Sequence, residues 1–241
     1  MGVGAEKSYN RGVVRPPPGN KPGSRSHYGG IGGDKDSART QAYADDAALV
    51  ARCIARDVAA QRELFRREYP RVNATLYRVL GSDRESEDLV QDAFVEVFRS
   101  LPSFRGEARL STWIDRIACR TAFQHLARRR TATVQLEVVA GHAEPTDPAE
   151  SPEARVQARE GLRRLYEVLA GLGAETRLSL TLHLLDGRPI AEVAELTGSS
   201  QVATRVRIWR GRRALEKAAA RDAVLAGYLD SATHDDVEGD S

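Results

Sequence analysis

Trp113 stands among arginines at helical spacing, and this combination suits single-stranded nucleic acid. Arg109 precedes the tryptophan by one helical turn, and Arg116 and Arg120 follow it by one and two turns. An aromatic ring stacks on an unpaired base, while guanidinium groups bind the neighbouring phosphates. A tryptophan without such neighbours is more often a core residue. The basic surroundings therefore favour a contact with nucleic acid.

A second concentration of positive charge lies in residues 201–217, where six basic residues face a single acid, Glu216. A helical pattern over 190–196 precedes it, Gly198 makes a turn, and one of the two serines after that glycine caps the second helix. This arrangement predicts a helix-turn-helix, whose second helix binds duplex DNA. The apolar residues of that helix that are available for packing are Val202, Val206, Ile208, Trp209 and Leu215.

An acidic surface precedes Trp113 in the chain. Apolar residues recur at helical spacing from Val90 to Leu101 and predict an amphipathic helix. Its polar side is mainly acidic and carries Asp88, Gln91, Asp92 and Glu96. This side is available to water or to a protein partner.

The residue types that carry enzyme chemistry form no recognisable pattern. The five histidines are scattered, and the chain has no HExxH motif, no phosphate-cradling glycine motif and no recognisable nucleophile setting. Its two cysteines, Cys53 and Cys119, lack metal-ligand spacing, which argues for a reducing compartment. We therefore predict a protein that is not an enzyme, with no catalytic residue, no metal site and no cofactor.

Helices must position all of these surfaces, and the sequence predicts an all-α protein of two small domains joined by a flexible linker. A chain of 241 residues with 41% hydrophobic content can build two modest cores. The formal net charge is only +2, so the uneven distribution of charge, and not its total, points to nucleic acid. No apolar run approaches the roughly 20 residues of a membrane span. The N-terminus also lacks the apolar core of a signal peptide, so we expect a cytoplasmic protein without membrane insertion.

Amino-acid composition predicts the boundaries of the two domains, the linker and the terminal segments. Residues 1–44 are rich in Gly, Pro, Ser and Arg and should be a disordered extension, either solvated or weakly tethered to DNA. The two helical domains should span 45–130 and 158–220. Prolines and acids mark 131–157 as a flexible acidic linker, and 221–241 should be a frayed acidic tail.

The segment DLVQDAFVEVFRSLPSFRG, followed by LSTWIDRIACRTAFQHLARRR, resembles region two of extracytoplasmic-function (ECF) sigma factors of the sigma-70 family. In that family the first helix docks on the clamp helices of the largest catalytic subunit of bacterial RNA polymerase. The second helix opens and reads the minus-ten promoter element. The resemblance assigns polymerase binding to Asp88, Gln91, Asp92 and Glu96. It assigns single-strand contacts to Arg109, Trp113, Arg116, Arg120 and Gln124.

The segment RPIAEVAELTGSSQVATRVRIWRGRRALEKA resembles region four of the same family, which reads the minus-thirty-five element and packs on the polymerase flap. The family often has Gly-Thr-Val-Lys-Ser-Arg where this chain has Val202 to Arg207, so base preference does not carry over. The residues expected to contact duplex DNA are Ser200, Gln201, Thr204, Arg205, Arg207 and Arg210.

Together the two resemblances cover about Asp45 to Ala220 and imply a promoter-specificity subunit that responds to a stress or envelope signal. The implied partners are core RNA polymerase and promoter DNA, and the sequence leaves open whether an anti-sigma factor also binds. The linker would thread towards the RNA exit path, although a plain soluble spacer has the same composition. A stand-alone helix-turn-helix regulator and a helical adaptor without DNA activity also fit parts of the pattern. The acidic surface favours the sigma factor, because a stand-alone regulator needs no polymerase-docking face.

Overall fold

The computed structural model describes residues 33–129 and 152–234, and within these ranges it contains helices and no strand. The predicted all-α fold is confirmed. In chain order the helices are α1 (Gly33–Ile54), α2 (Val58–Leu80), α3 (Asp83–Ser100), the short 3-10 helix η1 (Leu101–Ser103), α4 (Leu110–Arg129), α5 (Pro152–Ala170), α6 (Ala174–Leu184), α7 (Ile190–Leu196), α8 (Gln201–Ala219) and α9 (Ala223–His234). None of them combines the length and apolar character that crossing a membrane requires.

Local signals set both ends of α2. The Asp57 side chain accepts hydrogen bonds from the backbone N–H groups two and three residues later, at 2.8 and 3.2 Å. At the other end Gly81 adopts a left-handed φ of 73° and closes the last turn. A Cβ atom at Gly81 would lie 2.4 Å from the ring of Tyr166 in α5. This glycine therefore ends α2 and also allows α5 to approach it closely.

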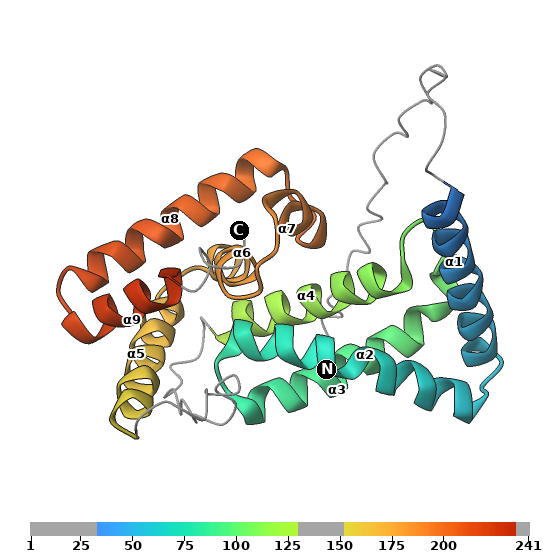
Figure 1. The fold of residues 1–241 in the computed structure, drawn as a ribbon. Helices are drawn as coiled ribbons and strands as arrows, with labels where there is room; N and C mark the ends of the chain where they lie inside the picture. Colours follow the sequence, from blue (N-terminus) through green and yellow to red (C-terminus); the bar gives the residue numbers. More distant parts are fainter. Residues whose placement is uncertain (1–32, 130–151, 235–241) are drawn as a thin grey trace, which may run out of the picture.

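The helices form two hydrophobic cores, and the first core crosses the boundary between the predicted domains. It contains the buried faces of α1 to α4 and is extended by five residues of α6 and α7, namely Ala174, Leu178, Leu182, Val193 and Leu196. The second core joins α5, α8 and α9 around Leu180 of α6. In Figure 1, α6 and α7 accordingly lie between α4 and α8. The two halves of the chain therefore pack directly on each other.

The structure differs from the expected boundaries at three places. Helix α1 begins within the expected extension 1–44, α5 begins within the expected linker 131–157, and α9 lies within the expected tail 221–241. Helix α9 is fixed by tertiary packing, since Leu225 is fully buried and Tyr228 packs over Gly161 of α5. The remaining parts of the extension, linker and tail lie outside the described residues.

Candidate nucleic-acid and polymerase interface

The residues expected to bind polymerase lie together on the polar side of α3. The opposite side of this helix, including Val90, Ala93 and Val97, is buried in the first core. Asp88, Gln91 and Asp92 are exposed, and the half-buried Glu96 accepts hydrogen bonds from Arg99 and Ser100. Val95 lies on the same side and is 56% exposed. The acidic face thus includes an apolar side chain that a protein partner could cover.

Helix α4 begins earlier than the sequence predicts. Local sequence signals favour Ser111 as the cap, but the helix starts at Leu110, whose backbone N–H donates to Asp46 of α1 at 3.2 Å. The same signals place Asp115 in the first turn, where the helix dipole favours a carboxylate, and in the structure its side chain is only 6% exposed. Contacts with distant parts of the chain, and not a local cap, therefore position the start of α4.

The five residues expected to bind the minus-ten strand share one face of α4 and the turn before it, because they recur at intervals of three and four residues. Trp113 is half-buried and packs edge-on against Phe104, with 5.4 Å between the ring centroids. Arg109, Arg120 and Gln124 are exposed. Arg116 forms an ion pair with Glu195 of α7. The structure brings the five together but joins one of them to the second half of the chain.

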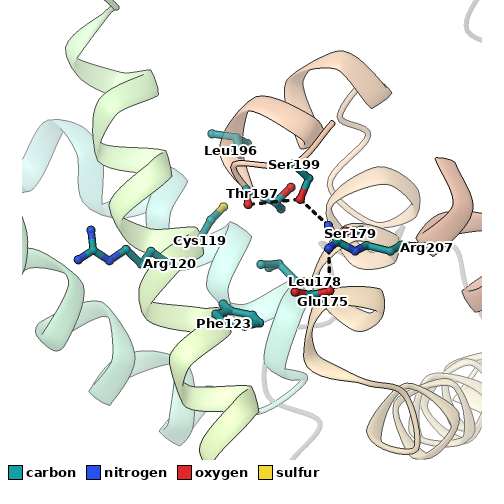
Figure 2. Close-up of a pocket in the computed structure, with 10 residues that line it drawn as sticks. All are labelled: Cys119, Arg120, Phe123, Glu175, Leu178, Ser179, Leu196, Thr197, Ser199 and Arg207. Carbon is teal, nitrogen blue, oxygen red and sulfur yellow. Dashed lines mark hydrogen bonds and ion pairs between the residues drawn. The ribbon is translucent and has the colours of Figure 1, made fainter. Parts of the chain in front are cut away.

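A cavity of about 130 Å³ lies between α4 and the second half of the chain. Cys119 and Phe123 of α4 line it opposite Leu178, Ser179 and residues from α7 and α8 (Figure 2). The Arg120 side chain points away from α7 in the same view. The hydroxyl of Ser179 is buried and has no hydrogen-bond partner among the described residues. Atoms around a void lose dispersion contacts, so packing between the two halves is looser at this cavity than packing within either core.

Five charged residues join the two halves beside this cavity, and we refer to them as the ion cluster: Arg71, Arg78, Asp115, Asp186 and Arg188. Asp186, whose side chain is 4% exposed, pairs with Arg78 at 2.6 Å and with Arg188 at 2.8 Å. Arg188 also reaches Asp115 at 3.1 Å, and Arg71 binds the same carboxylate. Burial raises the pKa of Asp115, while the two arginines beside it act in the opposite direction.

Arg177 and Tyr166 attach the second half to the end of α2. The buried guanidinium of Arg177 donates to the carbonyls of Val79 and Leu80, at 3.1 and 2.9 Å. The Tyr166 hydroxyl donates to the carbonyl of Arg78 at 2.8 Å. The last carbonyls of a helix have no partner within the helix, so these side chains satisfy acceptors that would otherwise be buried unpaired.

The predicted helix-turn-helix is present in α7 and α8. Gly198 lies in the turn with a φ of 63°, and the Ser200 side chain caps α8 by accepting from the backbone N–H of Ala203 at 3.1 Å. The outward side of α8 exposes Ser200, Gln201, Arg205 and Arg210. These four residues are accessible to a ligand.

Two other residues of the expected duplex surface point inward. Thr204 is fully buried, and its hydroxyl donates to the carbonyl of Ser200 at 3.0 Å. The geometry does not support the base contact expected for Thr204, which stabilises the start of α8 instead. Arg207 is 20% exposed and is held by Glu175, at 2.7 Å, and by the hydroxyl of Ser199. Arg207 therefore joins α8 to α6 rather than facing outward.

Comparisons with known proteins match both halves of the chain. Residues 64–132 match the family model described as Sigma-70 region 2, and residues 162–215 match Sigma-70, region 4. An ECF RNA polymerase sigma-E factor of Haemophilus influenzae is 30% identical over 177 residues, which cover 71% of this chain and 93% of the relative. The chain belongs to the ECF sigma factors of the sigma-70 family. It is an RNA polymerase sigma factor whose partners are core RNA polymerase and promoter DNA, and the stand-alone regulator is not favoured.

Other relatives of this sigma factor carry similar names. The ECF RNA polymerase sigma-E factor of Escherichia coli K12 is 29% identical, covering 71% of this chain and 92% of the relative. The RNA polymerase sigma-H factor of Pseudomonas aeruginosa is 30% identical, covering 59% of this chain and 77% of the relative.

Two solved structures are also similar to this sigma factor. CnrH in complex with the cytosolic domain of CnrY is 21% identical with a TM-score of 0.47, covering 77% of this chain and 97% of CnrH. The sigma factor RpoE of Bartonella quintana, in complex with the anti-sigma factor NepR, is 22% identical with a TM-score of 0.49, covering 67% of this chain and 97% of RpoE.

Sequence reasoning about this sigma factor misses the ion cluster and Arg177. From its neighbours Asp186 is recognisable only as part of a helix stop, and its partner Arg78 lies 108 residues earlier in the chain. A buried charge has no sequence signal of its own when its partner belongs to another helix. The two regions of the sigma factor are therefore joined by contacts that only the three-dimensional structure reveals.

Proposed function

We propose that the sigma factor uses three separate helical faces to start transcription at its promoters. The exposed side of α3 binds core polymerase, the Trp113 face of α4 holds the melted minus-ten strand, and the outward side of α8 binds the minus-thirty-five duplex. The observation that carries this proposal is the separation of charge, because the α3 face is mainly acidic whereas α4 and α8 present arginines. The sigma factor acts with polymerase in the cytoplasm, in response to a stress or envelope signal, and catalyses no reaction itself.

The α3 face is tested by reversing its charge. Asp92→Lys combined with Glu96→Lys should weaken binding to core polymerase by at least about tenfold, because like charges then oppose each other at the contact. A matched control, Glu63→Lys with Glu153→Lys, makes the same change in net charge at exposed positions on α2 and α5. Titration of labelled sigma factor with core polymerase measures both. Equal affinities for the two double variants, with both still folded, would contradict the docking assignment.

The α8 face is tested by the salt dependence of duplex binding. Each phosphate that a protein neutralises contributes roughly −0.9 to the slope of log affinity against log salt concentration. Arg210→Ala should therefore flatten this slope by up to about one unit. Arg159→Ala, at an exposed position of α5 away from the helix-turn-helix, should leave the slope unchanged. An unaltered slope in the Arg210 variant would remove this residue from the DNA contact.

The packing of α4 on α7 cannot persist when both promoter elements are bound. The elements lie about 25 base pairs apart, which corresponds to roughly 85 Å of duplex at 3.4 Å per step. In this structure α4 and α7 touch through Arg116 and Glu195. We therefore infer that the described arrangement is a closed state, and that promoter recognition requires α4 to separate from α6 and α7.

A further inference from the structure

Three large apolar side chains are exposed along α8, and we call them the apolar stripe. Val202, Val206 and Trp209 are 68, 42 and 62% exposed. Residues four and seven positions apart lie on the same side of a helix, so the three side chains form one line. The sequence offers five apolar residues of α8 for packing, these three together with Ile208 and Leu215. Of the five, only Ile208 and Leu215 are buried within the described residues.

The apolar stripe runs along the middle of the outward side of α8. Thr204, Ile208, Gly211 and Leu215 form the buried side of the helix, which is opposite the stripe. Basic residues flank the stripe on both sides, and all of them are exposed. They are Arg205 and Arg212 on one side and Arg210 and Lys217 on the other.

This arrangement matches the major groove of duplex DNA in charge and in size. An α-helix fits into the major groove, where basic residues on both sides of the helix can reach the phosphates of both strands. The middle of the helix then faces the base edges. Val202 to Trp209 span about 10 Å along the axis, which corresponds to roughly three base pairs. The 5-methyl group of thymine is the apolar group that base edges present in this groove.

We propose that the apolar stripe contacts thymine methyl groups and so gives the sigma factor a preference for A·T pairs within the minus-thirty-five element. This inference rests on the proposed binding of α8 to duplex DNA. The arginines beside the stripe provide affinity, and the apolar stripe discriminates between bases by burying methyl groups. Val202 and Val206 lie in the first part of α8, the part of a recognition helix that contacts base edges.

The test uses the full chain and a duplex selected by it from a random-sequence pool. Each thymine in the selected site is replaced in turn by uracil, which lacks only the methyl group. Binding of the wild-type chain should weaken about fourfold at each thymine that the stripe contacts, the value of one buried methyl group. These positions should fall within about three neighbouring base pairs.

Single alanine variants then connect each methyl group to a side chain. Val202→Ala, Val206→Ala and Trp209→Ala should each reduce the thymine-to-uracil affinity ratio to about one at one position and leave it unchanged at the others. Arg210→Ala is the matched control, because it should weaken binding to both duplexes equally and preserve the ratio. The stripe is exposed, so the three variants should keep the wild-type melting temperature.

Three results would overturn the inference. Wild-type protein that binds the selected duplex without distinguishing thymine from uracil would show that the stripe buries no methyl group. Alanine variants that lose affinity for core polymerase while keeping the thymine-to-uracil ratio would make the stripe a protein contact. Absence of any sequence-selective, salt-dependent binding would refute the proposed duplex binding itself, and the inference with it.

Discussion

Asp186→Ala is expected to raise the reactivity of Cys119 towards a thiol reagent by roughly 100- to 1,000-fold. The substitution leaves Arg78 and Arg188 partly buried without their shared carboxylate, and we expect a cost of about 3–4 kcal/mol, in the lower part of the range for breaking a buried ion pair, because Arg188 keeps Asp115 and Glu192. The open state avoids this cost because both arginines regain water. Cys119 lines the cavity between the two halves (Figure 2) and is unreactive in the closed state, since burial raises the pKa of its thiol to about 12.

Cys53 provides an internal control for this experiment. It is buried in the first core on α1 and does not belong to the ion cluster, and burial also raises the pKa of its thiol. Mass analysis of the labelled peptides reports the two cysteines separately. Opening of the closed state predicts faster labelling of Cys119 alone, whereas general unfolding would accelerate both. Glu153→Ala, which removes an exposed carboxylate on α5, should change neither rate.

The same measurement tests the effect of core polymerase on the wild-type protein. If binding to polymerase separates α4 from α6 and α7, Cys119 should become accessible in the complex while Cys53 stays protected. A complex that transcribes from its promoter while Cys119 remains as protected as in the free chain would contradict the inferred opening.

Trp113→Ala is expected to reduce transcription from an intact duplex promoter by about 5- to 150-fold. This range corresponds to roughly 1–3 kcal/mol for stacking one base on an aromatic side chain. A promoter that is already opened by mismatches should restore part of the activity, because strand capture is then less demanding. Core-polymerase binding should stay near the wild-type value, since Trp113 lies on α4 and the docking face lies on α3.

Phe104→Ala separates strand capture from packing at the same place. Phe104 is the ring against which Trp113 packs, so its removal disturbs the same part of the first core without removing the stacking surface. If Trp113 captures the melted strand, Trp113→Ala should transcribe much less from the duplex promoter than Phe104→Ala, even when the two variants have similar melting temperatures. Equal losses of stability and activity in the two variants would show that the role of Trp113 is only structural.

Local signals in the sequence predict the helix-turn-helix and most of the helices, although α9 lies within the expected tail. The apolar spacing in α3, the caps at Asp57 and Ser200, and the left-handed glycines at 81 and 198 depend on residues within one or two turns of each other. The candidate faces also follow from spacing, because residues three and four positions apart share one side of a helix. For this reason residue spacing alone identifies the acidic face of α3 and the arginines of α8, whereas the expectation that the α3 face binds polymerase comes from the family resemblance.

Tertiary packing decided which side of α8 turns inward, and it decided that the two regions close on each other. Helix α8 has apolar residues on two sides, so its periodicity alone allows either orientation. The close approach of Leu180 to Gly211, where a Cβ atom would lie 2.7 Å from the leucine side chain, selects the side that buries Thr204 and exposes Trp209. The closed state likewise depends on Asp186 and Arg78, whose attraction operates only after chain segments 108 residues apart have come together. Hydrophobic periodicity is a property of neighbouring residues, whereas the choice between two apolar faces and the pairing of buried charges depend on contacts that exist only in the folded chain.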